Sequence, residues 1–177
     1  MPAENESSKD NESSKKVEPR ASRPWMPYYG MLPADQGQGL LPWSYARERL
    51  GKSHNYLLST VRPDGAPHLA PIWGLWWEEK FYFSTGRQSR KGRNLAANAR
   101  CVVSTDSIND VVIVEGVAEQ LPDAAIPQPL FDLYPAKYPP WKLDPSLGPV
   151  FVVRPRVVFA FPESDFVGAS TRWHFDA

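Results

Sequence analysis

Residues 84–95 hold the side chains best suited to chemistry in this chain, in the order Ser-Thr-Gly-Arg-Gln-Ser-Arg-Lys-Gly-Arg-Asn-Leu. Four cations fall within seven positions: Arg87, Arg90, Lys91 and Arg93. An alternating apolar run precedes this stretch and a short helical pattern over 94–98 follows, which puts Ser89 where a helix N-cap would lie. A helix N-terminus offers unpaired N–H groups and the positive end of a dipole, and hydroxyl and guanidinium groups added there suit a phosphate. A solvated, charged first turn fits the same spacing, so both interpretations stay open.

The other reactive side chains form no recognisable catalytic or metal-binding set, so we assign no catalytic residue and expect no metal. The three histidines, His54, His68 and His174, have no partners at the spacing of a Ser-His-Asp arrangement or of a metal site. Cys101 is the only cysteine, which excludes an intrachain disulfide and fits a reducing cytoplasm. Two valines follow Cys101, so we expect a small buried side chain and not a reactive thiol.

Composition limits the class of protein. The chain has 177 residues, which fits one folded domain, and its formal net charge of +0 argues against nucleic acid as a partner. The longest apolar stretch, 69–77, is too short to span a bilayer and contains proline and glycine. The N-terminus lacks the apolar region of a signal peptide. We therefore expect a cytoplasmic protein without a membrane partner.

Residues 1–40 differ from the rest of the chain. Met1–Arg23 is polar and charged with almost no large apolar residue, so we expect it to be disordered. The aromatic, proline-bearing stretch 25–32 is either an extended strap or a loose linker. We place the folded domain at 41–177, following a disordered or extended tail at 1–40.

Six alternating or apolar runs predict strands, and turn residues separate them. These runs are 54–62, 66–77 (bent near Pro71 and Gly74), 81–85, 101–105, 111–117 and 150–161. Gly116 suggests a bulge, while Pro149 and Pro155 suggest that the last strand lies at an edge. Short helices are predicted at 43–50, 94–98 and 130–133. We predict a mainly β fold, an antiparallel barrel with short helices, because closure removes exposed strand edges.

An ordered series of motifs then resembles a known family. The series begins at 57–68 with Leu-Leu-Ser-Thr-Val-Arg-Pro-Asp-Gly-Ala-Pro-His and continues at 71–73 with Pro-Ile-Trp. Residues 83–95 then contain Phe-Ser-Thr-Gly, Ser-Arg-Lys and Asn-Leu, and residues 114–119 are Val-Glu-Gly-Val-Ala-Glu. The series resembles the pyridoxamine 5′-phosphate oxidase-like family of flavin-binding proteins, most closely over residues 43–121. The resemblance implies a six-stranded antiparallel split β-barrel of the FMN-binding type. It also implies a homodimer with the flavin in a groove between two barrels.

The resemblance also implies a cofactor site. In that family, residues that match Ser84 and Thr85 at a strand end, and Arg90 and Lys91 at a helix start, contact the flavin's ribityl-phosphate arm. The segment that matches 70–75 lies along the isoalloxazine ring, where Gly74 permits close backbone approach. The implied cofactor-binding residues are Ala70, Pro71, Ile72, Trp73, Ser84, Thr85, Ser89, Arg90, Lys91 and Asn94.

Two differences between this sequence and the family's pattern bear on the choice of cofactor and substrate. True pyridoxamine phosphate oxidases carry an Arg and a Lys in the ring-side strand, and the stretch 70–75 has neither. Their C-terminal substrate-binding pattern is also missing. A branch of the family that uses the deazaflavin coenzyme F-420 has the same basic helix start with an apolar ring-side strand, and this sequence is at least as similar to it. FMN is the expected cofactor and F-420 the alternative; the candidate substrate-facing or lid residues are His68, Arg172, Trp173 and His174.

Three hypotheses follow. The first is a flavin-dependent oxidoreductase that transfers hydride between the bound flavin and a small conjugated substrate, because flavin chemistry needs no separate catalytic triad. The second is a non-catalytic homodimer of the same fold that binds flavin, deazaflavin or haem. The third is a structural dimer whose basic helix start binds only stray anions.

Overall fold

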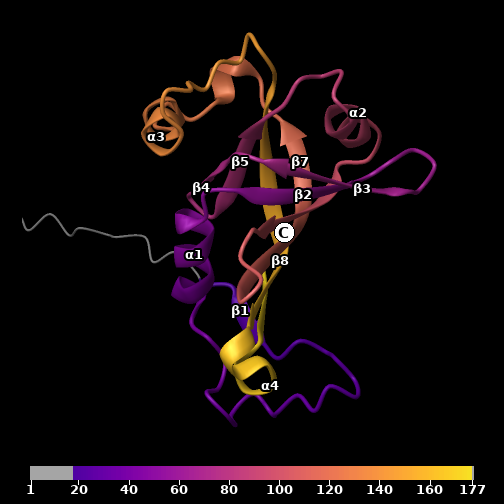
Figure 1. The fold of residues 1–177 in the computed structure, drawn as a ribbon, viewed down its shortest axis with the longest axis vertical. Coiled ribbons are helices and arrows are strands. Elements are labelled where there is room, and N and C mark those ends of the chain that lie inside the picture. The colour runs from indigo at the N-terminus through magenta and orange to yellow at the C-terminus, as the bar shows by residue number, and fades with distance from the viewer. Residues whose placement is uncertain (1–17, 177) are drawn as a thin grey trace, which may run out of the picture.

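The computed structural model describes residues 18–176, which form a nine-stranded antiparallel sheet with short helices around it. The strands are β1 (Arg20–Ser22), β2 (Tyr56–Val61), β3 (Pro67–Ile72), β4 (Leu75–Trp77), β5 (Lys80–Ser84), β6 (Arg100–Thr105), β7 (Asp110–Gln120), β8 (Val150–Pro162) and β9 (Thr171–His174). The α-helices are α1 (Trp43–Lys52), α2 (Arg90–Ala97), α3 (Leu130–Lys137) and α4 (Phe166–Ala169), with 3₁₀ turns at Asp123–Ala125 and Glu163–Asp165. Figure 1 places α2 and α3 at one end of the molecule and α4 at the other.

The pairing of the strands traces a barrel that is open at one step. The sheet order is β1-β9-β8-β7-β6-β2-β3, and β4 pairs with β5, which pairs with β8. Since β3 runs into β4 along the chain, the circuit from β8 through β7, β6, β2, β3, β4 and β5 returns to β8. Its one step without strand pairing is the passage from β3 to β4. This arrangement confirms the predicted mainly β, split-barrel fold.

Gly74 makes the break between β3 and β4. A Cβ built on Gly74 would collide with the Phe81 ring and lie 2.7 Å from the carbonyl oxygen of Tyr82, both on β5. Only glycine lets the two backbones approach this closely. The bend predicted near Pro71 and Gly74 is therefore confirmed, and it divides the predicted strand 66–77 into two.

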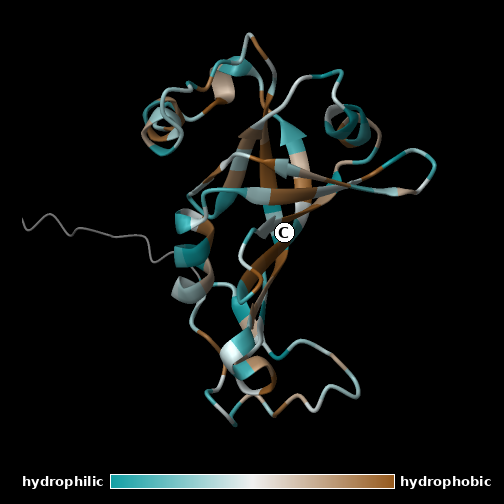
Figure 2. Cartoon of the chain, viewed as in Figure 1, coloured by the Kyte–Doolittle hydropathy of each residue, from teal (hydrophilic) through white to brown (hydrophobic). Residues whose placement is uncertain are grey.

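The core fills the barrel and continues outside it. Inward-facing residues of the strands, such as Leu58, Phe81 and Val153, are fully buried. Trp43 of α1 belongs to this core, with its ring 5.4 Å from that of Trp173 in an edge-on contact. A second apolar cluster packs the segment 121–143 against the outer side of β4, β5 and β8. Figure 2 shows this distribution, with brown, apolar segments on the central strands and teal on the hairpin tip and on outward helical turns.

The strand count is nine and not six because β1 and β9 add to the sheet and 66–77 is divided. The predicted disorder of Met1–Arg23 is wrong for residues 20–22, which pair with β9. Residues 1–17 lie outside the described part. Backbone pairing with β9 orders β1, Ala21 packs against the core, and Arg23 adds hydrogen bonds to the carbonyl oxygens of Leu32, Pro33 and Ser170. The boundary at residue 40 stays a prediction.

The predicted edge position of the last strand is also wrong. β8 pairs with β7 along its whole length, while on its other side residues 150–153 pair with β5 and residues 157–160 pair with β9. Pro155 lies between these two partners, so its missing N–H removes no pairing on that side. The predicted bulge at Gly116 is confirmed, because the register with β8 shifts between Glu115 and Gly116. No helix of the described residues has the length and apolar character needed to cross a membrane.

Candidate functional site

The N-terminus of α2 is capped as the sequence predicts. The Ser89 hydroxyl accepts a hydrogen bond from the backbone N–H of Gly92 at 3.0 Å and lies 3.0 Å from the Thr85 hydroxyl. Ser84 donates to the carbonyl oxygen of Gly148 at 3.0 Å. Three of the predicted cofactor-binding hydroxyl residues are therefore gathered between the end of β5 and the start of α2.

Gly92 lets the loop before α2 lie tightly on the first turn of the helix. A Cβ on Gly92 would lie 2.6 Å from the Gly86 carbonyl oxygen, so a larger residue would push loop and helix apart. This close contact positions Ser89 over the free N–H groups of the first turn. The sequence pattern did not single out Gly92, although a glycine inside a predicted helix is a signal of close backbone approach.

The cations of this stretch divide into two groups. Within residues 18–176, none of the ion pairs involves Arg90, Lys91 or Arg93. Arg87 instead donates to the Gln120 side-chain oxygen at 3.3 Å. No acidic residue occurs between Ser84 and Ala97. The helix start therefore combines side-chain cations and the helix dipole without a compensating carboxylate, which suits a dianion such as a phosphate.

The ring-side strand β3 offers a free backbone edge and an apolar surface. It is the last strand in the sheet order, so only its β2 side is paired by a strand in the described chain. Leu69 is 62% exposed and Trp73 is 38% exposed, and Pro71 is exposed between them. Ala70 is half-buried, while Ile72 points into the core. A flat heterocycle would find apolar contact and backbone hydrogen-bonding groups here, with Ile72 contributing only its backbone.

Asn94 lies inside the molecule and not on the surface of the helix start. Its side chain is fully buried and donates from Nδ2 to the Thr60 hydroxyl at 2.9 Å. The same hydroxyl lies 3.4 Å from His68 Nδ1. The structure thus connects two predicted site residues, Asn94 and His68, through Thr60. Sequence reasoning missed Thr60, although a polar residue at the inward-facing position of β2 was a usable signal.

The C-terminal candidates lie on β9, which pairs with β1 and with β8. Figure 1 places α4, which precedes β9, at the opposite end of the molecule from α2, and the C-terminus that follows β9 near the centre of the view. Trp173 is 1% exposed, so the predicted lid role is wrong for this residue, which packs in the core. Arg172 donates to the Ser22 hydroxyl at 3.1 Å. For His174, partial burial and then the nearby Arg172 and Arg20 lower the pKa of the imidazole.

The end of α3 closes the break between β3 and β4. Lys137 donates to the Tyr56 hydroxyl at 2.8 Å and to the Gly74 carbonyl oxygen at 3.1 Å. The Tyr138 hydroxyl accepts from Gly74 N–H at 3.1 Å, and its ring stacks on Trp73 with centroids 5.0 Å apart. Burial lowers the pKa of Lys137 to about 8. This aromatic and proline-rich segment therefore fixes the end of the ring-side strand.

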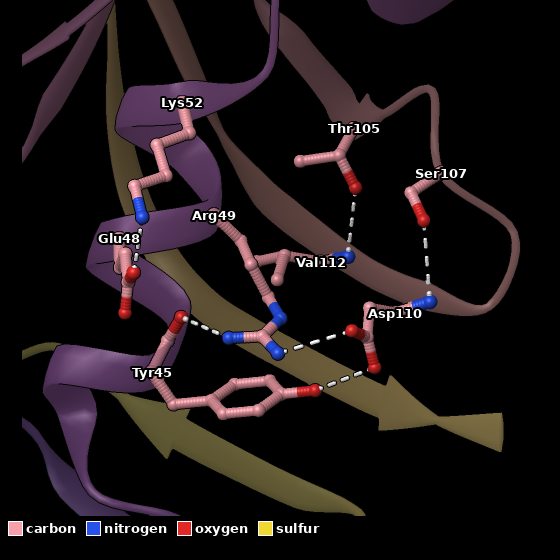
Figure 3. Close-up of polar contacts among 8 residues, drawn as sticks. All are labelled: Tyr45, Glu48, Arg49, Lys52, Thr105, Ser107, Asp110 and Val112. Atoms are coloured by element: carbon pink, nitrogen blue, oxygen red, sulfur yellow. Dashed lines mark hydrogen bonds and ion pairs between the residues drawn. The ribbon is translucent and has the colours of Figure 1, made fainter. Parts of the chain in front are cut away.

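A charged cavity of about 380 Å³ lies between α1 and the turn after β6. Figure 3 shows its central contacts: Asp110 accepts hydrogen bonds from Tyr45 at 2.9 Å and from Arg49 at 3.0 Å. The hydrogen bond from Tyr45 holds the pKa of Asp110 below its usual range. Lys52 pairs with Glu48 on the same helix. The hydrogen bonds from Tyr45 and Arg49 to Asp110 therefore tie α1 to the β6–β7 turn.

A second cavity, of about 440 Å³, lies on the outer face of β2, β6, β7 and β8. Valines surround three exposed charges there, Arg100, Glu115 and Arg156. Cys101 reaches the wall but is 5% exposed, and burial raises the pKa of its thiol to about 12. Cys101 is therefore a small buried side chain, as expected. Among residues 18–176, no group of three His, Cys, Asp or Glu side chains is placed to hold a metal ion.

Comparison with known proteins gives a family match. The family model described as Pyridoxamine 5′-phosphate oxidase matches residues 44–160, more than half of the chain. This range contains β2 to β7, α2 and most of β8. No curated protein matches the sequence.

Solved structures support the same fold. An F-420 reductase is 26% identical with a TM-score of 0.53, and the match covers 67% of this chain and 98% of that one. A FAD-binding protein from Mesorhizobium loti is 19% identical with a TM-score of 0.53, over 75% of this chain and 94% of that one. A haem-binding protein from Mycobacterium smegmatis is 17% identical with a TM-score of 0.51, over 73% of this chain and 62% of that one. The last two show likeness of fold alone.

Proposed function

This chain belongs to the pyridoxamine 5′-phosphate oxidase family, and from that premise we propose that it is an oxidoreductase that binds FMN or the deazaflavin coenzyme F-420 between α2 and β3. The observation that carries the proposal is the start of α2. There, Arg90, Lys91 and Arg93 lie beside the Ser89 cap without an acidic partner among the described residues. The F-420 reductase at 26% identity supports a deazaflavin as one of the two candidates.

The residues present fit the phosphate end of such a cofactor. The Thr85 and Ser89 hydroxyls lie together at the helix start, and Ser84, at the end of β5, bonds the Gly148 carbonyl oxygen. A phosphate group there would gain charge-assisted hydrogen bonds from Arg90 and Lys91 and the favourable end of the helix dipole. These groups bind and orient; none of them needs to exchange a proton during the reaction.

The ring end would lie along β3. Its unpaired backbone edge would accept and donate hydrogen bonds to the polar rim of a heterocycle, while Leu69 and Trp73 would contact its flat faces. Tyr138 and Lys137 hold the end of this strand through Gly74, so the ring platform is rigid. A bound flavin supplies hydride transfer at its ring, and the chain's part is to position the ring, exclude water and admit a substrate.

We propose further that the active form is a homodimer. The outer faces of β2, β3, β6, β7 and β8 expose or half-expose apolar side chains, among them Leu57, Leu69, Val102, Ile113 and Phe159. Arg100, Arg156 and Glu115 lie on the same outer surface. In a two-fold interface each patch meets its own copy, so one carboxylate and two guanidinium groups can pair reciprocally.

The dimer is tested by light scattering of the full chain. We expect a dimer that Glu115→Arg weakens and that Glu115→Arg combined with Arg156→Glu restores. A wild-type monomer at micromolar concentration would contradict the proposed interface.

Cofactor binding tests the function itself. Apo-protein is titrated with FMN, riboflavin, F-420 and a phosphate-free deazariboflavin, with fluorescence as the readout. We expect one phosphate-bearing cofactor to bind about 10-fold or more tightly than its phosphate-free counterpart, because charge-assisted contacts contribute about 1.5–3 kcal/mol each. Equal affinity for both members of each pair would refute the phosphate site. Reduction of the bound cofactor followed by turnover with an unsaturated substrate separates an enzyme from the alternative, a non-catalytic flavin- or haem-binding homodimer.

A further inference from the structure

A buried polar chain connects the helix of the proposed phosphate site to the ring-side strand. Asn94 on α2 is fully buried, and Thr60 on β2 is 1% exposed. Asn94 Nδ2 lies 2.9 Å from Thr60 Oγ1, which lies 3.4 Å from His68 Nδ1 on β3. Thr60 and His68 are also direct partners in the register of β2 and β3. A buried polar group is costly unless it is hydrogen-bonded, so the contacts through Thr60 favour this arrangement of the three side chains. Asn94 Oδ1 has no partner among the described residues.

The direction of these hydrogen bonds follows from the number of protons that each side chain can donate. Thr60 has one hydroxyl proton, and its oxygen accepts from Asn94 Nδ2. His68 Nδ1 is the remaining contact of this hydroxyl, so the proton points to Nδ1. An imidazole nitrogen that accepts is unprotonated, and a neutral ring then carries its proton on Nε2.

His68 Nε2 is free to meet a ligand. It makes no hydrogen bond to the described residues, and it is not among their buried side-chain atoms that lack a partner. The two ring nitrogens point away from each other. His68 is half-buried and lies on β3, whose other edge no described strand pairs. The ring of the proposed cofactor would lie along this edge.

We propose that Asn94 and Thr60 are positioning residues that hold His68 in the neutral Nε2–H form, and that this N–H donates a hydrogen bond to the bound cofactor. The second half rests on the proposed function, and the first half does not. The 3.4 Å separation is long for a hydrogen bond to nitrogen, so the tautomer is biased and not locked.

The first half is tested on the cofactor-free full chain by ¹⁵N NMR of labelled histidines. The chain has three histidines, and His68→Phe identifies the His68 signals by their loss. At about pH 8.5 unperturbed imidazoles are neutral. We expect the Nε2–H form to predominate in the wild type, the Nδ1–H form to gain population in Thr60→Val, and Thr60→Ser to retain the wild-type pattern.

Two results would overturn the tautomer assignment. Predominance of the Nδ1–H form in the wild type would mean that Thr60 donates to Asn94 and accepts from His68. An unchanged tautomer in Thr60→Val would mean that the hydroxyl does not set it. Amide spectra of the variants establish that the fold is kept, and they separate loss of the hydroxyl from unfolding.

The second half is tested by affinity and visible spectrum of the bound FMN or F-420. We expect His68→Phe to weaken binding about three- to tenfold, the size of one neutral hydrogen bond, and to shift the absorption band of the cofactor. Thr60→Val should move both in the same direction and Thr60→Ser should restore them. Binding with unchanged affinity and spectrum in His68→Phe would overturn the contact alone. Failure of the wild type to bind either cofactor would overturn the contact together with the proposed function, while the tautomer result stands.

Discussion

Lys137 makes the pH dependence of stability a test of how α3 closes the barrel. Burial lowers the pKa of its ammonium from an ordinary value of 10.5 to about 8 in the folded protein. Between these two values the unfolded chain binds more protons than the folded one, so the free energy of unfolding rises with pH. Below about pH 8 the folded state carries the cost of a charged, half-buried lysine.

The magnitude follows from the two pKa values. A change from 10.5 to about 8 corresponds to about 3.4 kcal/mol. We discount this to about 1–2 kcal/mol, because a half-buried ammonium is screened by solvent. Tyr45 and Tyr138, whose pKa values burial raises to about 12, act in the opposite direction only above about pH 10. The thiol of Cys101, whose pKa burial raises to about 12, acts in the opposite direction from about pH 9. The contribution of Lys137 from about pH 8 to about pH 10 is therefore read as the difference between the wild type and a variant that lacks only this ammonium.

The assay is urea unfolding followed by tryptophan fluorescence, for the wild type and for Lys137→Met. The variant leaves neither partner without a hydrogen bond, because Tyr56 still donates to Leu50 and the Gly74 carbonyl still accepts from Tyr138. We expect the free energy of unfolding of the wild type, relative to that of Lys137→Met, to rise by about 1–2 kcal/mol between about pH 8 and about pH 10. Lys142→Met, at an exposed lysine of the same segment, is the matched control and should follow the wild type. Parallel curves for the wild type and Lys137→Met would refute the buried position of the ammonium.

Three further substitutions, two of them with a matched control variant, test the site and the fold. Lys91→Met should weaken binding of the phosphate-bearing cofactor by about 10- to 150-fold in a fluorescence titration and leave binding of its phosphate-free counterpart unaffected. Arg87→Met is the control, because the Arg87 guanidinium bonds Gln120, and it should change neither affinity. Gly74→Ala should lower the melting temperature strongly, by about 2–4 °C for each kcal/mol lost, because its Cβ would collide with a ring and a backbone oxygen on β5. Gly86→Ala, with open space around the Cβ, should melt within about 2 °C of the wild type. Glu78→Asn should raise the free energy of unfolding by about 0.5–1 kcal/mol, because Glu78 has φ +46° and asparagine tolerates that region; a lower midpoint in urea would contradict the strain.

Local rules explain why several elements were predictable from sequence. Ser89 precedes a helical pattern and caps α2 as expected, because an N-cap depends only on the residues next to it. Gly74 and Gly116 were expected at a bend and a bulge, and both occur there. The order of motifs over 57–119 pointed to the family to which the chain belongs.

Contacts between distant segments were beyond such rules. β1 exists because β9 lies beside it, and nothing in residues 20–22 alone favours a strand. The prolines of β8 suggested an edge, but the change of partner from β5 to β9 at Pro155 lets the strand lie inside the sheet. Trp173 looked like a lid residue in sequence and is a core residue, because α1 brings Trp43 against it.

The candidate site likewise has features that the sequence predicts and features that only the tertiary structure shows. The sequence alone determined the cations and hydroxyl residues of 84–95, because they are contiguous and lie at a strand-to-helix junction. Only the tertiary structure decided which of them remain available, since Arg87 is bonded to Gln120 and Asn94 is buried against Thr60. It also brought Lys137 to Gly74 and joined Asn94 to His68. Each of these contacts joins residues that are far apart in the sequence, and closure of the barrel sets its geometry. A short stretch of sequence therefore does not contain the information that would predict it.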